Sequence, residues 1–371
     1  MSFITAIGTA TPVNKFSQGT IAEFMIKTMQ LNAEDARKLR AIYRMTGIET
    51  RHSVLSDYGK TKDFDFFPNS PETDPFPSTR TRGELFRKHA LSLSVNSANN
   101  CLQGLSDFDN KSVTHLIVVS CTGMYAPGLD IDLVNALKLN THTERLCINF
   151  MGCYAAFNAI KQADYICRSR SDAKVLIVCT ELCSIHFQKE NTEDNLLANA
   201  LFADGSASLL MQSKPAGTIN LKPASFYSEL ALQGSEDIAW TVGDLGFEMR
   251  LSSYVPDIIR QGIQQLTQRL LQQIDAELSD IDYYAIHPGG KKILESIETG
   301  LAISPTQNQY AYNTLRQFGN MSSPTVLFVL QEIFRRLKQE DNHKKILSVA
   351  FGPGLTLESM ILEVIINNHA R

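Results

Sequence analysis

Cys153 lies in the stretch 149–160, NFMGCYAAFNAI, directly after a glycine and before a run of small and apolar residues. This pattern predicts that a strand ends and a helix begins around Cys153. The positive end of a helix dipole favours a thiolate over a thiol, and Gly152 allows a sharp turn and leaves room for a bound acyl group. The same stretch is also typical of a small-residue helix that packs tightly on a sheet. Taken alone, Cys153 is therefore either a nucleophile or a buried core thiol.

Two further polar residues follow predicted secondary-structure boundaries. His287 in YYAIHPGGKK is predicted at the carboxyl end of an apolar strand, the edge at which α/β sheets bind ligands. Asn320 in QFGNMSSP can donate hydrogen bonds to a developing oxyanion. Each residue also has a purely structural explanation. His287 fits a buried histidine whose hydrogen bonds are satisfied, and Asn320 fits an asparagine in a turn. The stretch AFGPGLTLE, 350–358, by itself predicts only a rigid turn between strands.

Short apolar strands alternate with helices, which indicates an α/β fold. Strands are predicted at 3–7, 113–120, 145–150, 173–181, 205–212, 282–288 and 355–365, and 344–354 is predicted as a strand followed by a glycine turn. Helices are predicted at 33–45, after 127–128, and at 153–169, 255–274, 290–298 and 323–340, with Ser323 as N-cap and Pro324 at the first position of the last helix. The polar, proline-rich stretch 55–83 is predicted to run over the surface.

The second half of the chain repeats the order of parts found in the first. KVLIVCTE corresponds to KILSVAFG, and GSASLLMQ corresponds to LESMILEV. This pattern suggests a duplication with a join near 215–220, and therefore an N-terminal half, 1–217, that carries Cys153 and a C-terminal half, 218–371, that carries His287 and Asn320.

Composition narrows the classes of function. The 371 residues are 43% hydrophobic and 20% charged with net charge −4, which gives no electrostatic reason to expect nucleic-acid binding. No apolar stretch reaches the ~18 residues of a membrane span, and the first residues lack a basic signal-peptide segment. We therefore expect a cytoplasmic protein without stable membrane association. The seven scattered cysteines indicate reduced thiols. Cys179 and Cys183 lack a second pair at zinc-ligand spacing, so no metal is expected.

Five stretches together resemble the chalcone/stilbene synthase superfamily, the type III polyketide synthases. They are MGCYAA with Cys153, ALFADG with Phe202, IHPGGKKIL with His287, GNMSSPTVLF with Asn320, and FGPG at 351–354. The stretch CTELCSIHFQ is similar to bacterial and fungal members that make alkylpyrones and alkylresorcinols from fatty acyl-CoA.

This resemblance implies a thiolase-like fold with αβαβα layers, a homodimer, and acyl-CoA and malonyl-CoA as substrates. It implies that the Cys153 thiolate, held as an ion pair by His287, attacks the starter thioester. His287 and Asn320 then donate hydrogen bonds to the malonyl thioester oxygen and stabilise the enolate left by loss of CO2. Phe202 shapes the entrance, and no metal or prosthetic group is required.

Several positions depart from the pattern of the plant enzymes. Met249 stands in place of a second gatekeeper phenylalanine, Ala126 in place of a methionine offered across the dimer interface, and Ala350 in place of a glycine. The remaining positions that the resemblance assigns to the substrate are Cys121, Thr122, Cys183, His186, Ser322, Gly352, Pro353 and Gly354, and those assigned to the CoA phosphates are Lys38 and Arg44. Met is flexible and Cys is small, so we expect a pocket that accepts a long acyl chain.

Two other functions remain open. A ketoacyl synthase of the fatty-acid type also uses Cys, His and Asn, but it performs one condensation and takes its extender from acyl carrier protein. A non-catalytic subunit that only binds acyl groups or a partner needs none of the three residues to react. FGPG and ALFADG favour the polyketide type over the fatty-acid type.

Overall fold

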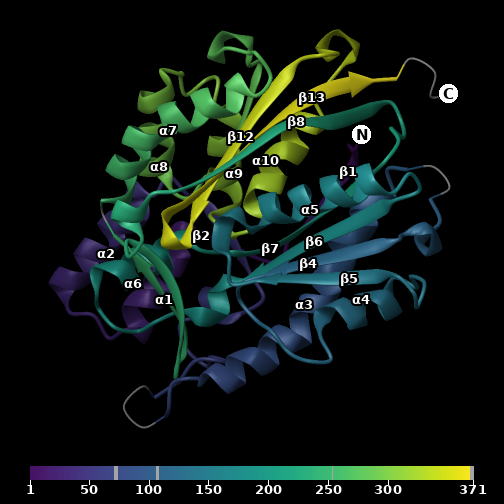
Figure 1. The fold of residues 1–371 in the computed structure, drawn as a ribbon. Coiled ribbons are helices and arrows are strands. Elements are labelled where there is room, and N and C mark those ends of the chain that lie inside the picture. Colours follow the sequence, from purple (N-terminus) through teal and green to yellow (C-terminus); the bar gives the residue numbers. More distant parts are fainter. Residues whose placement is uncertain (71–73, 106–107, 253, 368–371) are drawn as a thin grey trace.

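A computed structural model describes residues 1–70, 74–105, 108–252 and 254–367. Its main feature is a nine-stranded sheet in the order β11-β12-β13-β8-β1-β7-β6-β4-β5 (Figure 1). The strands are β1 Phe3–Ala10, β4 His115–Ser120, β5 Glu144–Asn149, β6 Lys174–Leu182, β7 Asp204–Gln212, β8 Ile219–Leu230, β11 Tyr283–Ile286, β12 Lys345–Gly352 and β13 Thr356–Ile366. Two small sheets pair β2 (Asn14–Ser17) with β3 (Thr50–Ser53) and β9 (Ile238–Gly243) with β10 (Gly246–Leu251).

The helices are α1 Gln18–Thr28, α2 Ala33–Met45, α3 Thr79–Leu102, α4 Leu129–Ala136, α5 Ala155–Ser169, α6 Glu193–Leu201, α7 Val255–Gln272, α8 Lys291–Leu301, α9 Gln309–Phe318 and α10 Thr325–Phe334. Helices α5 and α10 lie between the two parts of the large sheet (Figure 1). Helices α3 and α4 cover one outer face, and α7 and α8 cover the other.

Alternation along the buried strands produces these layers. Val175 and Ile177 of β6 face the core around α5 and α10, whereas Leu176 faces the core around α3. In β12, Ile346 joins the central core and Leu347 the core around α7. Because successive strand residues point to opposite faces, strands that are apolar on both faces are covered on both sides. The αβαβα layering expected of a thiolase-like fold is therefore present.

The two halves of the sheet have the same topology. In one half β4 runs parallel to β6, β6 antiparallel to β7, and β7 antiparallel to β1. In the other, β11, β12, β13 and β8 repeat these relations in the same order. The halves meet where β1 pairs with β8 through Ile4 and Leu221. The correspondences read from the sequence are those of β6 with β12 and of β7 with β13. The division at 217/218 falls between β7 and β8 and stays a prediction.

Two local predictions are wrong. The stretch 55–83, of which residues 71–73 lie outside the described part, does not simply run over the surface: Tyr58, Phe64, Phe67 and Phe76 are buried around Phe24 of α1. These aromatic side chains bury too much apolar area to remain in solvent.

Ser323 is also not the N-cap of α10, which begins at Thr325 with Pro324 as its cap residue. The Ser323 hydroxyl donates instead to Glu181 Oε1 at 2.5 Å, because α10 starts beside the buried end of β6.

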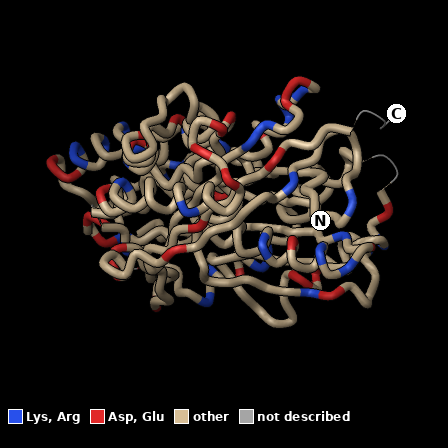
Figure 2. The backbone as a smooth tube through the Cα atoms, turned by 45° about the horizontal axis from the view of Figure 1, so that its top comes forward, with Lys and Arg blue, Asp and Glu red and all other residues tan. Residues whose placement is uncertain are grey.

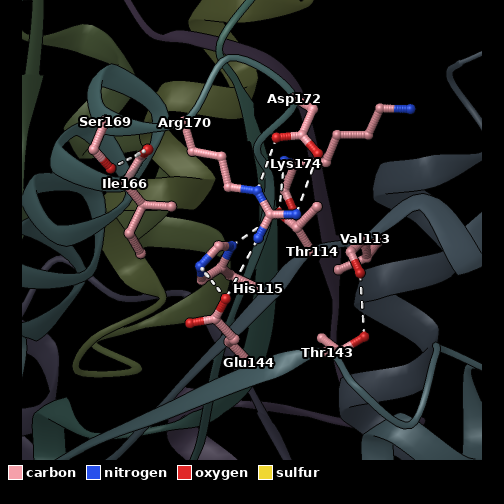
Figure 3. Close-up of polar contacts among 10 residues, drawn as sticks. All are labelled: Val113, Thr114, His115, Thr143, Glu144, Ile166, Ser169, Arg170, Asp172 and Lys174. Carbon is pink, nitrogen blue, oxygen red and sulfur yellow. Dashed lines mark hydrogen bonds and ion pairs between the residues drawn. The ribbon is translucent and has the colours of Figure 1, made fainter.

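Charged residues of both signs are interspersed along the backbone (Figure 2). One group of them gathers at the amino ends of β4, β5 and β6 (Figure 3). There Glu144 lies 3.4 Å from both His115 and Arg170, and Arg170 also pairs with Asp172 at 2.8 Å. These charged residues lie at the amino ends of the parallel strands. Cys153 and His287, singled out in the sequence, follow strands and therefore lie at the opposite edge, with the carboxyl ends.

Candidate active site

The carboxyl ends of the parallel strands bring the predicted residues together. Cys121 follows β4, Cys153 follows β5, Cys183 follows β6 and His287 follows β11. All four line one cavity of about 250 Å³, together with Asn320 from the connection between α9 and α10. Residues from both halves of the chain therefore form a single site.

Cys153 lies in a short 3-10 turn, Gly152–Tyr154, immediately before α5, which is the predicted position at a helix start. Its sulfur lies 3.9 Å from the Asn320 amide and 3.8 Å from Ser322 Oγ. Burial raises the pKa of Cys153 to about 11, although the contacts with Ser322 and Asn320 act in the opposite direction. The resting group is therefore a thiol.

Gly152 is required by its neighbours. Its φ is +73°, and an added Cβ would lie 2.3 Å from Cδ of Pro353 in the FGPG turn. The space predicted for an acyl group is thus occupied in part by Pro353. Ala350, which stands in place of a glycine of the plant enzymes, lies within β12 opposite Glu358, where an extended backbone suits any residue. Within the turn itself, Gly354 has φ +73°.

Asn320 is held by backbone bonds. Its N–H donates to Leu201 O at 2.9 Å, and its carbonyl accepts from Ala203 N at 2.8 Å. The side-chain oxygen accepts from Ser322 N at 2.8 Å, and the amide nitrogen donates to Gly289 O at 3.3 Å; the oxygen and the nitrogen each lie 3.9 Å from Cys153 Sγ. A side-chain amide nitrogen on the lining of the cavity is suited to stabilise an oxyanion.

His287 lines the same cavity, but the predicted ion pair with Cys153 is not formed. The residue is buried, and neither ring nitrogen has a hydrogen-bond partner among the described residues. Burial lowers the pKa of His287 to about 3, so the imidazole is neutral. A buried polar group without a hydrogen-bond partner costs free energy. Both ring nitrogens of His287 are therefore available to form hydrogen bonds with a ligand in the cavity.

Glu181, near the end of β6, was not predicted as a site residue. Its carboxylate accepts from Cys121 N at 2.9 Å, Thr122 Oγ1 at 2.8 Å and Ser323 Oγ at 2.5 Å. Burial raises the pKa of Glu181 to about 7 despite these donors. The residue joins the wall of the N-terminal half to the loop that carries Asn320. The only trace in the sequence was a polar residue within the apolar run KVLIVCTEL.

Most of the residues predicted for the substrate pocket line this cavity. They are Cys121, Thr122, Cys183, Phe202, Met249, Ser322, Gly352 and Pro353. Gly354 does not line it, and the exposed Ala126 does not either.

His186 does not line the Cys153 cavity and serves the structure instead. Its Nε2 donates to Thr122 O at 2.7 Å, its Nδ1 accepts from Phe247 N at 3.0 Å, and its ring stacks on Phe247 at 4.2 Å. Burial lowers the pKa of His186 to about 3, which keeps the ring neutral with this tautomer.

A further set of wall residues was missed. Trp240 lies opposite Met249 in the β9–β10 hairpin and donates through Nε1 to Cys121 O at 2.7 Å. The others are apolar residues of the same hairpin and of α7: Ile238, Leu251, Val255 and Ile259. Apolar residues alternate over 238–251, and this pattern was the available signal for a hairpin with one apolar face. The pattern does not show that this face lies against the cavity.

The predicted phosphate-binding residues do not lie at the cavity. Lys38 is 3.9 Å from Glu193, and neither Lys38 nor Arg44 contributes to the lining. Among the described lining residues, the only Lys, Arg, Asp or Glu side chains are those of Lys291 and Lys292, at the start of α8.

Within the described ranges, no three His, Cys, Asp or Glu side chains are grouped so that they could hold a metal ion. In the same part of the chain, no helix has the length and apolar character of a membrane span.

Comparisons with known proteins agree with this site. The N-terminal domain model of the chalcone and stilbene synthases matches residues 1–215, and the C-terminal domain model matches 226–366. An "alpha-pyrone synthesis polyketide synthase-like Pks18" of Mycobacterium tuberculosis is 30% identical over 370 residues, which cover 98% of this chain and 92% of the relative. A putative chalcone synthase of Bacillus subtilis is 27% identical over 97% of this chain and 98% of its own.

Solved structures give the same result. The C-terminal type III polyketide synthase domain of Steely1 from Dictyostelium superimposes with a TM-score of 0.90 at 27% identity, covering 98% of this chain and 99% of that one. PKS-I of the brown alga Ectocarpus siliculosus gives 0.89 at 25% identity, covering 98% of each chain. The chain therefore belongs to the chalcone and stilbene synthase family and is a type III polyketide synthase, an acyltransferase-type enzyme with the thiolase-like fold.

Proposed function

We propose that this enzyme loads a fatty acyl-CoA starter on Cys153, extends it with malonyl-CoA and releases a cyclised alkylpyrone or alkylresorcinol. The observation that carries the proposal is the single cavity in which Cys153, His287 and Asn320 meet walls that are mostly apolar. The relative named for alpha-pyrone synthesis supports a product of this kind.

Loading requires a thiolate, whereas the resting pair is a thiol and a neutral imidazole. In the proposed step, the Cys153 proton passes to a ring nitrogen of His287 as the sulfur attacks the thioester carbonyl. The bond from that carbonyl to CoA then breaks, and the leaving thiolate takes the proton from His287. The acyl group remains on Cys153.

Extension uses hydrogen-bond donors that line the cavity. As malonyl-CoA loses CO2, the electrons of the broken C–C bond move toward the thioester oxygen. Asn320 Nδ2 and the N–H of His287 donate to that oxygen and stabilise the enolate. The enolate carbon attacks the acyl carbonyl, the C–S bond breaks, and Cys153 leaves as a thiolate. In this scheme the side chains need no metal or prosthetic group.

Two features of the lining support a CoA thioester with a fatty acyl chain. Lys291 and Lys292 are exposed cations, suited to the CoA phosphates, with no acidic side chain among the described lining residues. Ile238, Val255 and Ile259 present a buried apolar wall.

We also propose that the protein is a homodimer, with a cytoplasmic location as predicted from the sequence. Strand β5 ends the sheet, and its Leu146 and Cys147 are exposed. An unpaired edge strand with exposed apolar residues is a natural surface for a second copy.

Product analysis tests the catalytic proposal. The purified protein is incubated with malonyl-CoA and acyl-CoA starters of increasing length, without carrier protein, and products are identified by mass. Each buried methylene contributes about 0.8 kcal/mol, so use of the starter should rise roughly tenfold per two-carbon unit and then fall abruptly. Coumaroyl-CoA should be a poorer starter. A preference for coumaroyl-CoA, or no dependence on chain length, contradicts the fatty-acyl assignment.

The same experiment separates the closest alternative. A ketoacyl synthase of the fatty-acid type would require malonyl groups on carrier protein and would stop after one condensation. Products with two or more malonyl units, formed from malonyl-CoA alone, exclude it.

A further inference from the structure

Helix α7 contributes part of the apolar wall of the catalytic cavity. Val255 and Ile259 of this helix are buried, as are Ile238 of β9 and Phe351 of β12, and all four line the cavity. They belong to the core packed between α7 and the outer face of β12 and β13. Under the proposed function, on which this inference rests, this wall faces the tail of the acyl chain.

A second cavity of about 190 Å³ lies between α7, the end of β8 and the start of β13. Leu355, Leu357 and Gly262 contribute to its lining, and exposed Gln261 and Gln265 lie at its outer side. Ile259 is the only described residue that lines both this cavity and the catalytic one. One side chain therefore stands between the two spaces.

We infer that Ile259 is the specificity-determining residue that ends the acyl-binding cavity and determines the longest starter that the enzyme accepts. A β-branched side chain within a helix has essentially one χ1 rotamer, so Ile259 is a rigid end wall. Met249, elsewhere on the lining, is unbranched and adapts more easily. The length limit consequently belongs to Ile259, and the space behind it stays empty of substrate.

Chain-length profiles of kcat/KM test the assignment. In Ile259→Ala, starters two to four carbons beyond the wild-type limit should continue to gain roughly tenfold per two-carbon unit. The matched control is Ile263→Ala, one turn further along α7, which is also fully buried and lines neither cavity. Its limit should remain that of wild type. Should Ile259→Ala fail to fold, Ile259→Val removes one methylene and should shift the limit in the same direction by less.

A second substitution shows where the added carbons go. A Cβ at Gly262 has only Leu357 within 4 Å, at 3.9 Å, so Gly262→Leu can fill the second cavity without a backbone clash. Alone it should leave the wild-type profile unchanged, because substrate does not reach that space. Combined with Ile259→Ala, it should cancel the gain for long chains.

The outcomes separate this inference from the proposed function. If the wild-type enzyme limits chain length and the limit is unchanged in both Ile259→Ala and Ile259→Val, the role of Ile259 is overturned. The proposed function is unaffected by that result. A gain that persists in the double variant refutes the route through the second cavity. A wild-type enzyme without any dependence on acyl length overturns the proposed starter class itself.

Discussion

Cys153 and His287 line the same cavity without a hydrogen bond between them, and burial favours the neutral form of each. The two catalytic tasks are consequently divided among different atoms. In the proposed scheme, loading needs the Cys153 sulfur and a ring nitrogen of His287 that takes its proton, whereas stabilisation of the enolate needs the nitrogens of His287 and Asn320.

Cys153→Ala should abolish polyketide formation while malonyl-CoA decarboxylation survives in part, because both oxyanion donors remain. Release of labelled CO2 from malonyl-CoA measures the second reaction. Cys147→Ala, at an exposed cysteine of β5, is the control and should retain both reactions. Complete loss of decarboxylation in a folded Cys153→Ala protein contradicts this division of roles.

Asn320 lines the cavity, and its side-chain oxygen also accepts from Ser322 N. Replacement by alanine removes both features, so this substitution alone does not separate a catalytic role from a structural one. Asn320→Ala should reduce decarboxylation by roughly 10²–10³-fold, the usual effect of removing one oxyanion donor. Asn320→Asp keeps the acceptor and loses the donor, and should be impaired to a similar degree. Acylation of Cys153, followed by protein mass, should persist in both variants. Equal loss of acylation would show that Asn320 acts structurally.

Glu181 should impose a pH dependence on stability. Burial raises its pKa from 4.5 to about 7, so the protonated carboxyl favours the folded state below pH 4.5. This stabilisation, of about 3 kcal/mol by the shift in pKa, is lost as the pH rises through about 7. Glu181→Gln should therefore gain stability relative to wild type between pH 5 and pH 8, measured by urea unfolding. A pH-independent difference between the two proteins would mean that Glu181 does not titrate in this range.

At the scale of elements, the turn from β11 into α8 supplies both His287 and the cations of the lining. Helix α8 begins at Lys291 with no side-chain cap, and Lys292 follows. A helix N-terminus with lysines favours phosphate groups.

Lys292→Ala should accordingly raise KM for CoA thioesters by up to roughly fivefold, the upper range for an exposed charge pair. The increase should diminish at high salt. N-acetylcysteamine thioesters, which lack the phosphates, should show no change. Lys338→Ala, at an exposed lysine outside the cavity, is the control. Equal effects on both classes of thioester would assign Lys292 to the acyl or pantetheine part instead.

At the scale of the whole molecule, the candidate site combines residues from two halves that share one core. Cys153 comes from the first half, and His287 and Asn320 from the second. Helices α5 and α10 pack in the common central cluster. Association with a second copy is proposed at β5, the free edge of the first half.

Wild type should sediment as a dimer at micromolar concentration. Leu146→Asp should shift it toward monomer, because a charge on an exposed apolar edge residue disfavours pairing. Val13→Asp, at a residue that is 96% exposed, is the control for adding a charge. A monomeric wild type, or a dimer unaffected by Leu146→Asp, contradicts an interface at β5.

The sequence by itself determined the elements and the reactive groups that follow them. Apolar runs, helix starts and glycine turns are local patterns, so the alternating strands and helices, the repeated order of parts and the positions of Cys153, His287 and Asn320 could be predicted. The motif resemblance then assigned their chemistry.

Only the tertiary structure decided which other side chains meet these groups. Glu181, Trp240 and Ile259 lie far from Cys153 in the sequence, and His186 differs from a ligand-binding histidine only because Thr122 O and Phe247 N occupy its two nitrogens. Contacts of this kind depend on how strands, hairpin and helices pack, and residue type and spacing along one chain do not record those distances. The same reason explains why Lys38 was chosen over Lys292: both are exposed lysines on helices, and only the fold places one of them at the cavity.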